Sequence, residues 1–203
     1  MSRVPHPAET PDSALLDLAA AGDLEAFAAL FRRYQQVVYR FARAMTGSDD
    51  AADDITQEVF VALLTKAGRY DPARAAFGTY LYGMVRNLSR ARLRRDSRRL
   101  SLESFVLGND DTLFDDPASR IENDETMAAM RRALGRLPSR YRELIVLCDL
   151  HGLSYQEAAA VVDASVGAVR SRLHRGRQLL KLKFVSASRS ASPRAVQPAR
   201  CAV

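Results

Sequence analysis

Basic side chains recur at short intervals in the stretch Tyr155–Lys181, which reads YQEAAAVVDASVGAVRSRLHRGRQLLK. Its first half contains mostly small side chains and the acids Glu157 and Asp163, and its second half is strongly basic. Ser154 followed by Glu157 has the pattern of a capping box, and Ser165 can cap a second helix after a turn at Asp163. Two helices joined by three or four residues predict a helix-turn-helix, whose second helix can enter the DNA major groove.

A helical wheel divides this second helix into two faces. Val169, Leu173, Gly176 and Leu180 fall on one stripe and predict the buried side. The outer face and its flanks carry hydroxyl, imidazole, amide and guanidinium groups, which suit both base edges and phosphates. The predicted DNA-binding residues here are Ser165, Arg170, Ser171, Arg172, His174, Arg175 and Gln178. A solvated basic face on an ordinary helical hairpin is the alternative interpretation.

A second basic segment follows the loop RYDPARAAF. Arg86, Arg90 and Arg94 stand four residues apart, which places them on one ridge of a helix suited to a phosphate backbone. Phe77 and Tyr80 precede this ridge, and aromatic rings beside arginines offer a stacking surface for unpaired bases. For Phe77, packing in the core is the slightly favoured alternative.

Composition and charge pattern set the expected architecture. The chain has 203 residues and a net charge of +6, with few Gly and Pro residues and no strand-like alternation, so an all-α protein is expected. Seven arginines lie within residues 86–99, whereas residues 109–125 are strongly acidic, and this segregation suggests different partners for different segments. The expected division is a helical domain at 13–99, a flexible acidic linker at 100–121, a second helical domain at 122–184 and a disordered tail at 185–203.

Other classes of function find little support in the sequence. Cys148 and Cys201 form neither a disulfide framework nor a metal-ligand pattern, and no cofactor or metal is expected. No phosphate loop or paired catalytic carboxylates indicate an enzyme. The N-terminal stretch has no signal-peptide core and no segment is long enough to span a bilayer, so a cytoplasmic protein without membrane insertion is expected.

Three further motifs resemble those of a known family. Residues 137–181, which contain LPSRYRE, LSYQEAA and SVGAVRSRLHRGR, resemble region 4 of bacterial RNA polymerase sigma factors of the extracytoplasmic-function (ECF) type, in the sigma-70 superfamily. DDITQEVFVALL is similar to region 2.2 of that family, and FGTYLYGMVRNLSRARLRR to regions 2.3 and 2.4. The resemblance covers residues 13–184. Tyr80 stands where the family usually has Trp, and Asp163 where the turn usually has Gly.

The resemblance implies a promoter-specific initiation factor that performs no covalent chemistry. Expected partners are core RNA polymerase, through the clamp coiled coil of its largest subunit and the flap of its beta subunit, and promoter DNA; an anti-sigma factor is a further possible partner. The implied polymerase-binding residues are Asp53, Asp54, Gln57 and Glu58. The implied residues for minus-ten recognition and melting are Tyr70, Asp71, Arg74, Phe77, Tyr80, Arg86, Asn87, Arg90 and Arg94. The resemblance assigns the DNA-binding residues predicted above for the helix-turn-helix to the minus-thirty-five element.

A stand-alone helix-turn-helix regulator that binds DNA without polymerase is the alternative function. It accounts for residues 122–184 but leaves the stretches 49–67 and 77–99 without a role. Recruitment of core polymerase is the property that separates the two hypotheses.

Overall fold

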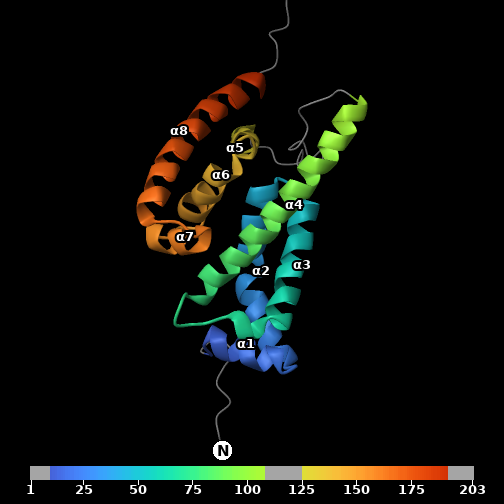
Figure 1. Cartoon of the computed structure of the whole chain (residues 1–203), viewed down its shortest axis with the longest axis vertical. Coiled ribbons are helices and arrows are strands. Elements are labelled where there is room, and N and C mark those ends of the chain that lie inside the picture. Colours follow the sequence, from blue (N-terminus) through green and yellow to red (C-terminus); the bar gives the residue numbers. More distant parts are fainter. Residues whose placement is uncertain (1–9, 108–124, 192–203) are drawn as a thin grey trace, which may run out of the picture.

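The computed structural model describes residues 10–107 and 125–191, and every regular element in these two ranges is helical (Figure 1). The N-terminal unit consists of α1 (Asp12–Ala20), α2 (Leu24–Thr46), α3 (Asp49–Thr65), the short 3-10 helix η1 (Ala67–Arg69) and α4 (Phe77–Leu107). The C-terminal unit consists of α5 (Glu125–Gly135), α6 (Ser139–Ile145), the π-helical turn η3 (Val146–Leu150), α7 (Tyr155–Val162) and α8 (Val166–Ala191). The predicted all-α class with two helical units is confirmed.

Side-chain caps set the start of several helices. The Asp23 carboxylate accepts hydrogen bonds from the backbone N–H groups of the first turn of α2, and the Ser48 hydroxyl does the same for α3. Ser154 and Glu157 form the predicted capping box at the start of α7. These caps satisfy backbone donors that lack partners inside the helix, which is why short polar residues occupy these positions.

Helix α2 is the centre of the N-terminal unit, and α1, α3 and α4 all pack against it. Leu30, Phe41 and Met45 on α2 are fully buried with Leu63 on α3 and Val85 on α4. Figure 1 shows α4 lying diagonally across the unit beside α2 and α3, and α4 also contacts α7 of the C-terminal unit. Burial of these large apolar side chains is the main source of stability for the unit.

The C-terminal unit is built around α8, which packs along α5 and α6 (Figure 1). Gly176 lets two of these helices approach closely: a Cβ atom at this position would lie 3.2 Å from Cδ1 of Ile145 and 3.3 Å from Cβ of Tyr141. Leu173 and Val169 are fully buried on the same side of α8. The predicted apolar stripe of this helix is therefore its packing face.

Two helices continue beyond their expected ends. α4 runs to Leu107 rather than ending near residue 99, and α8 runs to Ala191 rather than ending at 184. The expected end of the first helix relied on fading apolar periodicity, and that of the second on a composition rich in Ser, Ala, Pro and Arg. Periodicity reports packing, whereas a helix can continue through residues other than Gly and Pro. Gly108 and Pro193 are the first such residues after the two ends. The remainder of the expected linker, 108–121, the first residues of the expected second domain, 122–124, and the remainder of the tail, 192–203, lie outside the described residues.

No helix within 10–107 and 125–191 combines the length and the apolar character required to cross a bilayer. In the same residues, no three His, Cys, Asp or Glu side chains gather where they could hold a metal ion.

Candidate nucleic-acid and polymerase interface

The helix-turn-helix is formed by α7 and α8. Asp163, the residue that ends α7, adopts the left-handed conformation with φ of 53°. Aspartate tolerates this backbone better than most residues other than glycine, because its short side chain can hydrogen-bond locally. Ser165 then accepts a hydrogen bond from the backbone N–H of Ala168 at 3.2 Å and starts α8. The tight turn fixes the direction of α8 relative to α7.

Six of the seven residues predicted to read the minus-thirty-five element lie on the exposed side of α8, and the seventh, Ser165, directly precedes this helix. We call the seven the recognition face. All seven are exposed: Ser165, Arg170, Ser171, Arg172, His174, Arg175 and Gln178. Gln178 Nε2 lies 3.0 Å from His174 Nε2, so these two side chains already orient one another. The face presents cations for phosphates and neutral hydrogen-bonding groups for base edges.

Arg177 lies on α8 among these basic residues, but it has a different role. Its guanidinium forms a two-point contact with the Asp149 carboxylate of η3, with Nε–Oδ2 at 3.0 Å and Nη2–Oδ1 at 2.5 Å. Hydrogen bonding to Asp149 raises the pKa of Arg177 further above its ordinary value. The pair anchors α8 to the preceding turn, and no local sequence signal connects two residues this far apart.

The loop of residues 70–76 joins η1 to α4 and carries three predicted minus-ten residues. Asp71 accepts a hydrogen bond from the backbone N–H of Ala73 at 2.9 Å, which stabilises the loop turn. Asp71 and Arg74 are exposed, whereas Tyr70 is half-buried and its ring lies 5.3 Å from the ring of Tyr80. The loop therefore presents polar groups beside a half-buried aromatic pair.

Phe77 is buried, in contrast to the exposed Asp71 and Arg74 of the loop. Its side chain is only 4% exposed and packs between the rings of Tyr34 and Tyr70, at centroid distances of 5.1 and 5.2 Å. The core-packing alternative describes this placement, and Phe77 offers no ring face to a base here. Tyr80, which is half-buried at the edge of the same cluster, is the better placed ring for stacking.

The predicted arginine ridge on α4 is divided by the C-terminal unit. Arg86 Nε donates to Oε2 of Glu143 on α6 at 2.9 Å, and its side chain is only 12% exposed. Arg90 lies 4.0 Å from the same carboxylate, whereas Asn87 and Arg94 are exposed. In this arrangement the ridge offers its C-terminal part to a phosphate backbone, and Arg86 is engaged elsewhere.

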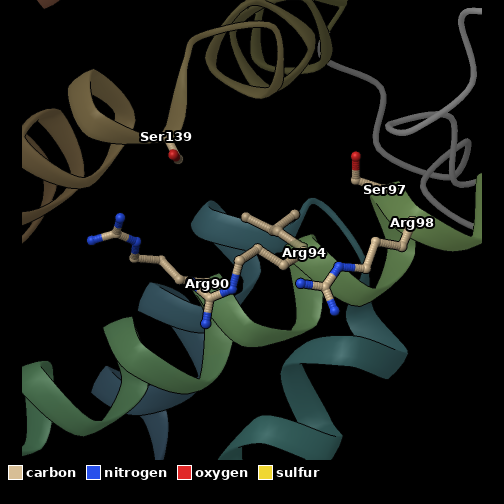
Figure 2. A pocket seen from close by; sticks show the side chains of 6 residues that line it. Arg90, Arg94, Ser97, Arg98 and Ser139 are labelled. Atoms are coloured by element: carbon tan, nitrogen blue, oxygen red, sulfur yellow. The ribbon is translucent and has the colours of Figure 1, made fainter. Parts of the chain in front are cut away.

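A pocket of about 400 Å³ lies beside this part of α4 (Figure 2). Arg90, Arg94 and Arg98 line it from α4, and Ser139 faces them from the start of α6 (Figure 2). The groups that line the pocket are mainly donors, so it favours anionic oxygen atoms.

The four predicted polymerase-binding residues lie on the outer side of α3, and we call them the acidic face. Asp53, Asp54, Gln57 and Glu58 are exposed, while the intervening Ile55 and Thr56 and the following Val59 are buried. Arg92 of α4 forms an ion pair with Asp54 at 3.2 Å, although the Asp54 side chain remains 65% exposed. The acids are thus available to a basic partner.

Family models match the chain in two separate segments. The family model Sigma-70 region 2 matches residues 30–99, which include α3 and most of the described N-terminal unit. The model Sigma-70, region 4 matches residues 127–180, which include the helix-turn-helix. The chain belongs to the sigma-70 family of RNA polymerase sigma factors, in its ECF group.

Individual relatives agree with this assignment. The chain is 36% identical over 154 residues to the ECF RNA polymerase sigma factor SigE of Mycolicibacterium smegmatis, covering 75% of this chain and 59% of that relative. It is 33% identical to the ECF RNA polymerase sigma-E factor of Escherichia coli, covering 85% of this chain and 93% of that relative. The solved structure of CnrH in complex with the cytosolic domain of CnrY matches with a TM-score of 0.64 and 29% identity, over 86% of this chain and 97% of that one.

A second solved structure, RpoE bound to the anti-sigma factor NepR from Bartonella quintana, has a TM-score of 0.65 at 22% identity and covers 80% of this chain and 98% of that one. At this identity it supports the fold alone.

Proposed function

We propose that this chain is a promoter-specific transcription initiation factor that binds core RNA polymerase, directs it to two promoter elements and assists in opening the duplex. The observation that carries the proposal is the presence of two matched units in one chain: one presents the acidic face and the aromatic 70–76 loop, and the other presents the recognition face. Such a factor acts by binding and positioning, without covalent chemistry of its own.

Each surface has a proposed partner. The acidic face binds basic residues of the clamp coiled coil of the largest polymerase subunit, and the C-terminal unit also contacts the flap of the beta subunit. The recognition face reads the minus-thirty-five element in the major groove. The 70–76 loop, Tyr80 and the exposed part of the α4 ridge bind the minus-ten element, where cations hold the backbone and rings stack on unpaired bases.

A cytoplasmic location and control by an anti-sigma factor are also part of the proposal. The second is supported by the solved structure of CnrH, which is 29% identical to this chain and was determined in complex with the cytosolic domain of CnrY. The stand-alone regulator is not favoured, because it gives no role to the acidic face or to α4.

Transcription in a purified system tests the function directly. Core polymerase should gain specific initiation at a subset of promoters when the full chain is added, and the chain should co-elute with core enzyme in a one-to-one complex. A chain that binds promoter DNA but never co-elutes with core polymerase would be a stand-alone regulator.

The recognition face yields a prediction on promoter binding. Arg170→Ala or Arg175→Ala should weaken binding to a minus-thirty-five element by about 1–3 kcal/mol where the arginine reads a base, with a smaller loss and a reduced salt slope where it holds a phosphate. Fluorescence anisotropy over a range of salt concentrations separates the two cases. Unchanged affinity for both variants, with intact helical circular dichroism, would remove α8 from the DNA interface.

Tyr80 yields a prediction on melting. A base leaving the duplex loses stacking of a few kcal/mol, and a protein ring can return about 1–3 kcal/mol per base. Tyr80→Ala should therefore leave closed-complex binding nearly unchanged but reduce open-complex formation, and promoter DNA with a bubble at the minus-ten element should partly rescue it. Permanganate reactivity of minus-ten thymines measures the opening.

The control for this prediction is Arg90→Ala, which should weaken the binding of duplex and bubble DNA alike, because its expected contact is to the backbone. Equal thymine reactivity for the wild-type chain and Tyr80→Ala would assign Tyr80 to the packed cluster alone.

A further inference from the structure

Helix α1 is attached to α2 by the carboxylate of Asp12, the first residue of α1. Asp12 Oδ1 accepts a hydrogen bond from Nη1 of Arg33 at 2.6 Å, and Asp12 Oδ2 accepts one from the hydroxyl of Tyr34 at 2.5 Å. Burial raises the pKa of Tyr34, and the hydrogen bond to Asp12 raises it further, so the phenol stays protonated and donates. Hydrogen bonds to a charged acceptor are the strong ones, and both carboxylate oxygens are used here.

The ring of Tyr34 continues this attachment toward the 70–76 loop. It lies edge-on to the ring of Phe77, the first residue of α4, with 5.1 Å between the ring centroids. The ring of Phe77 in turn lies 5.2 Å from that of Tyr70, the first residue of the loop. The contacts that begin at Asp12 therefore reach both ends of the loop.

Helix α1 supports the loop by a second route. It contacts η1, the 3-10 turn that directly precedes Tyr70, and Figure 1 shows α1 lying beside this end of the unit. Burial raises the pKa of Tyr70, and the carboxylate of Asp12 raises it further, so Asp12 is close enough to act on this ring electrostatically. The region 2 family model begins at residue 30, so α1 precedes the segment that the model matches.

We propose that Asp12 and Tyr34 are positioning residues for the 70–76 loop, and that they hold Tyr70 and Tyr80 in the arrangement that receives an unpaired base of the minus-ten element. This role rests on the proposed part that the loop plays in promoter opening. Neither Asp12 nor Tyr34 needs to touch DNA. A ring whose orientation is fixed before binding loses less conformational freedom when it receives a base, and the complex is tighter for that reason.

Hydrogen exchange of the free chain, followed by NMR, measures the positioning without DNA. Inside the loop, the backbone N–H of Ala73 donates to the Asp71 carboxylate at 2.9 Å and that of Arg74 to the Asp71 carbonyl at 3.1 Å. Tyr34→Phe keeps the ring and removes the hydrogen bond to Asp12, whereas Asp12→Ala removes both acceptors. Each variant should speed the exchange of these two loop amides about threefold or more. Tyr34→Phe preserves the test if Asp12→Ala folds poorly.

Binding of promoter DNA by the complex of the full chain with core polymerase measures the consequence. Bubble promoters are prepared with all minus-ten bases present and with each base in turn replaced by an abasic sugar. For the wild-type chain, loss of the captured base should weaken binding about fivefold or more. Tyr34→Phe should lower this base preference about threefold or more and leave the affinity for the abasic promoter unchanged. A general loss of structure would instead lower both affinities together.

The matched control is Tyr39→Phe. The hydroxyl of Tyr39 donates to Oδ1 of Asp49 at 2.7 Å, and Asp49 also pairs with Arg43, so the same three side-chain types make the same kind of contact elsewhere in the N-terminal unit. Asp49 starts α3, whereas the 70–76 loop lies beyond the other end of that helix. Tyr39→Phe should therefore leave both the loop exchange and the base preference unchanged.

Loop exchange that stays at the wild-type rate in Tyr34→Phe and Asp12→Ala would overturn the positioning role. So would a loss of affinity that intact and abasic promoters share equally. If loop exchange rises but the wild-type chain shows no base preference at any position, the positioning holds and the proposed role of the loop at the minus-ten element is wrong. Failure of the proposed function would therefore be seen separately from failure of the positioning.

Discussion

Charge reversal of the acidic face, by Asp54→Lys together with Glu58→Lys, is expected to abolish assembly with core RNA polymerase. The two substitutions would place like charges against a basic partner, which costs several kcal/mol, so affinity should fall about a hundredfold or more. The fold should survive, because both side chains are exposed and the surface pair of Asp54 with Arg92 contributes little. Co-elution with core enzyme and surface binding kinetics measure the loss.

The matched control is Asp17→Lys together with Glu25→Lys, which adds the same charge to other exposed acids of the N-terminal unit. It should retain assembly, and both double variants should retain binding to a minus-thirty-five element through α8. Assembly that survives the first pair of substitutions at moderate salt would mean that the acidic face is only a solvated helix surface.

Among the substitutions considered, Arg142→Ala is expected to lower the free energy of unfolding the most. The guanidinium donates to the carbonyl oxygens of Leu134, Gly135 and Leu137, at 3.1 Å and 2.9 Å for the first and last, and to that of Met45. Its removal deprives these buried carbonyls of the guanidinium donors, although Leu134 keeps a hydrogen bond from the backbone N–H of Leu137, and it opens a cavity, so the free energy of unfolding should fall by about 3 kcal/mol or more. Burial lowers the pKa of Arg142 to about 10, and the side chain therefore stays charged at neutral pH.

Urea unfolding followed by circular dichroism measures this change. Arg140→Ala is the control, because Arg140 is exposed and lies over the Tyr141 ring at 4.8 Å, a contact worth about 0.5–1 kcal/mol. Arg142→Lys should rescue little, since an ammonium group cannot reach several carbonyls in the fork geometry of a guanidinium. Similar losses for Arg140→Ala and Arg142→Ala would contradict the assigned role.

Local chemistry made much of the fold and of the recognition face predictable. The capping box at Ser154, the cap at Ser165 and the left-handed turn at Asp163 each depend on a few neighbouring residues. The apolar stripe that contains Val169 and Leu173 depends on helical periodicity alone. Features of this kind can be recognised in sequence because the interacting groups lie within one or two turns.

Features that depend on distant partners were not predictable in this way. Arg86 looks like a member of a regular ridge, but its carboxylate partner Glu143 lies 57 residues away. Arg142 looks like an ordinary surface cation, and only the fold brings the carbonyl ends of two other helices to it. From the sequence, Phe77 could either stack on a base or pack in the core, and only its contacts with Tyr34 and Tyr70 in the fold decide between the two. The DNA and polymerase roles of the remaining residues stay predictions.

Helix α4 has a mechanical consequence that follows from its length. It contains 31 residues, which at 1.5 Å per residue makes a rod of about 46 Å. The 70–76 loop is attached at one end, Tyr82 and Arg86 lie near that end, and the chain leaves for the C-terminal unit at the other. On such a rod a tilt of about 5° at Phe77 displaces the Leu107 end by about 4 Å. A small rotation at the end of α4 that carries the 70–76 loop therefore corresponds to a larger displacement at the end from which the chain continues to the second unit.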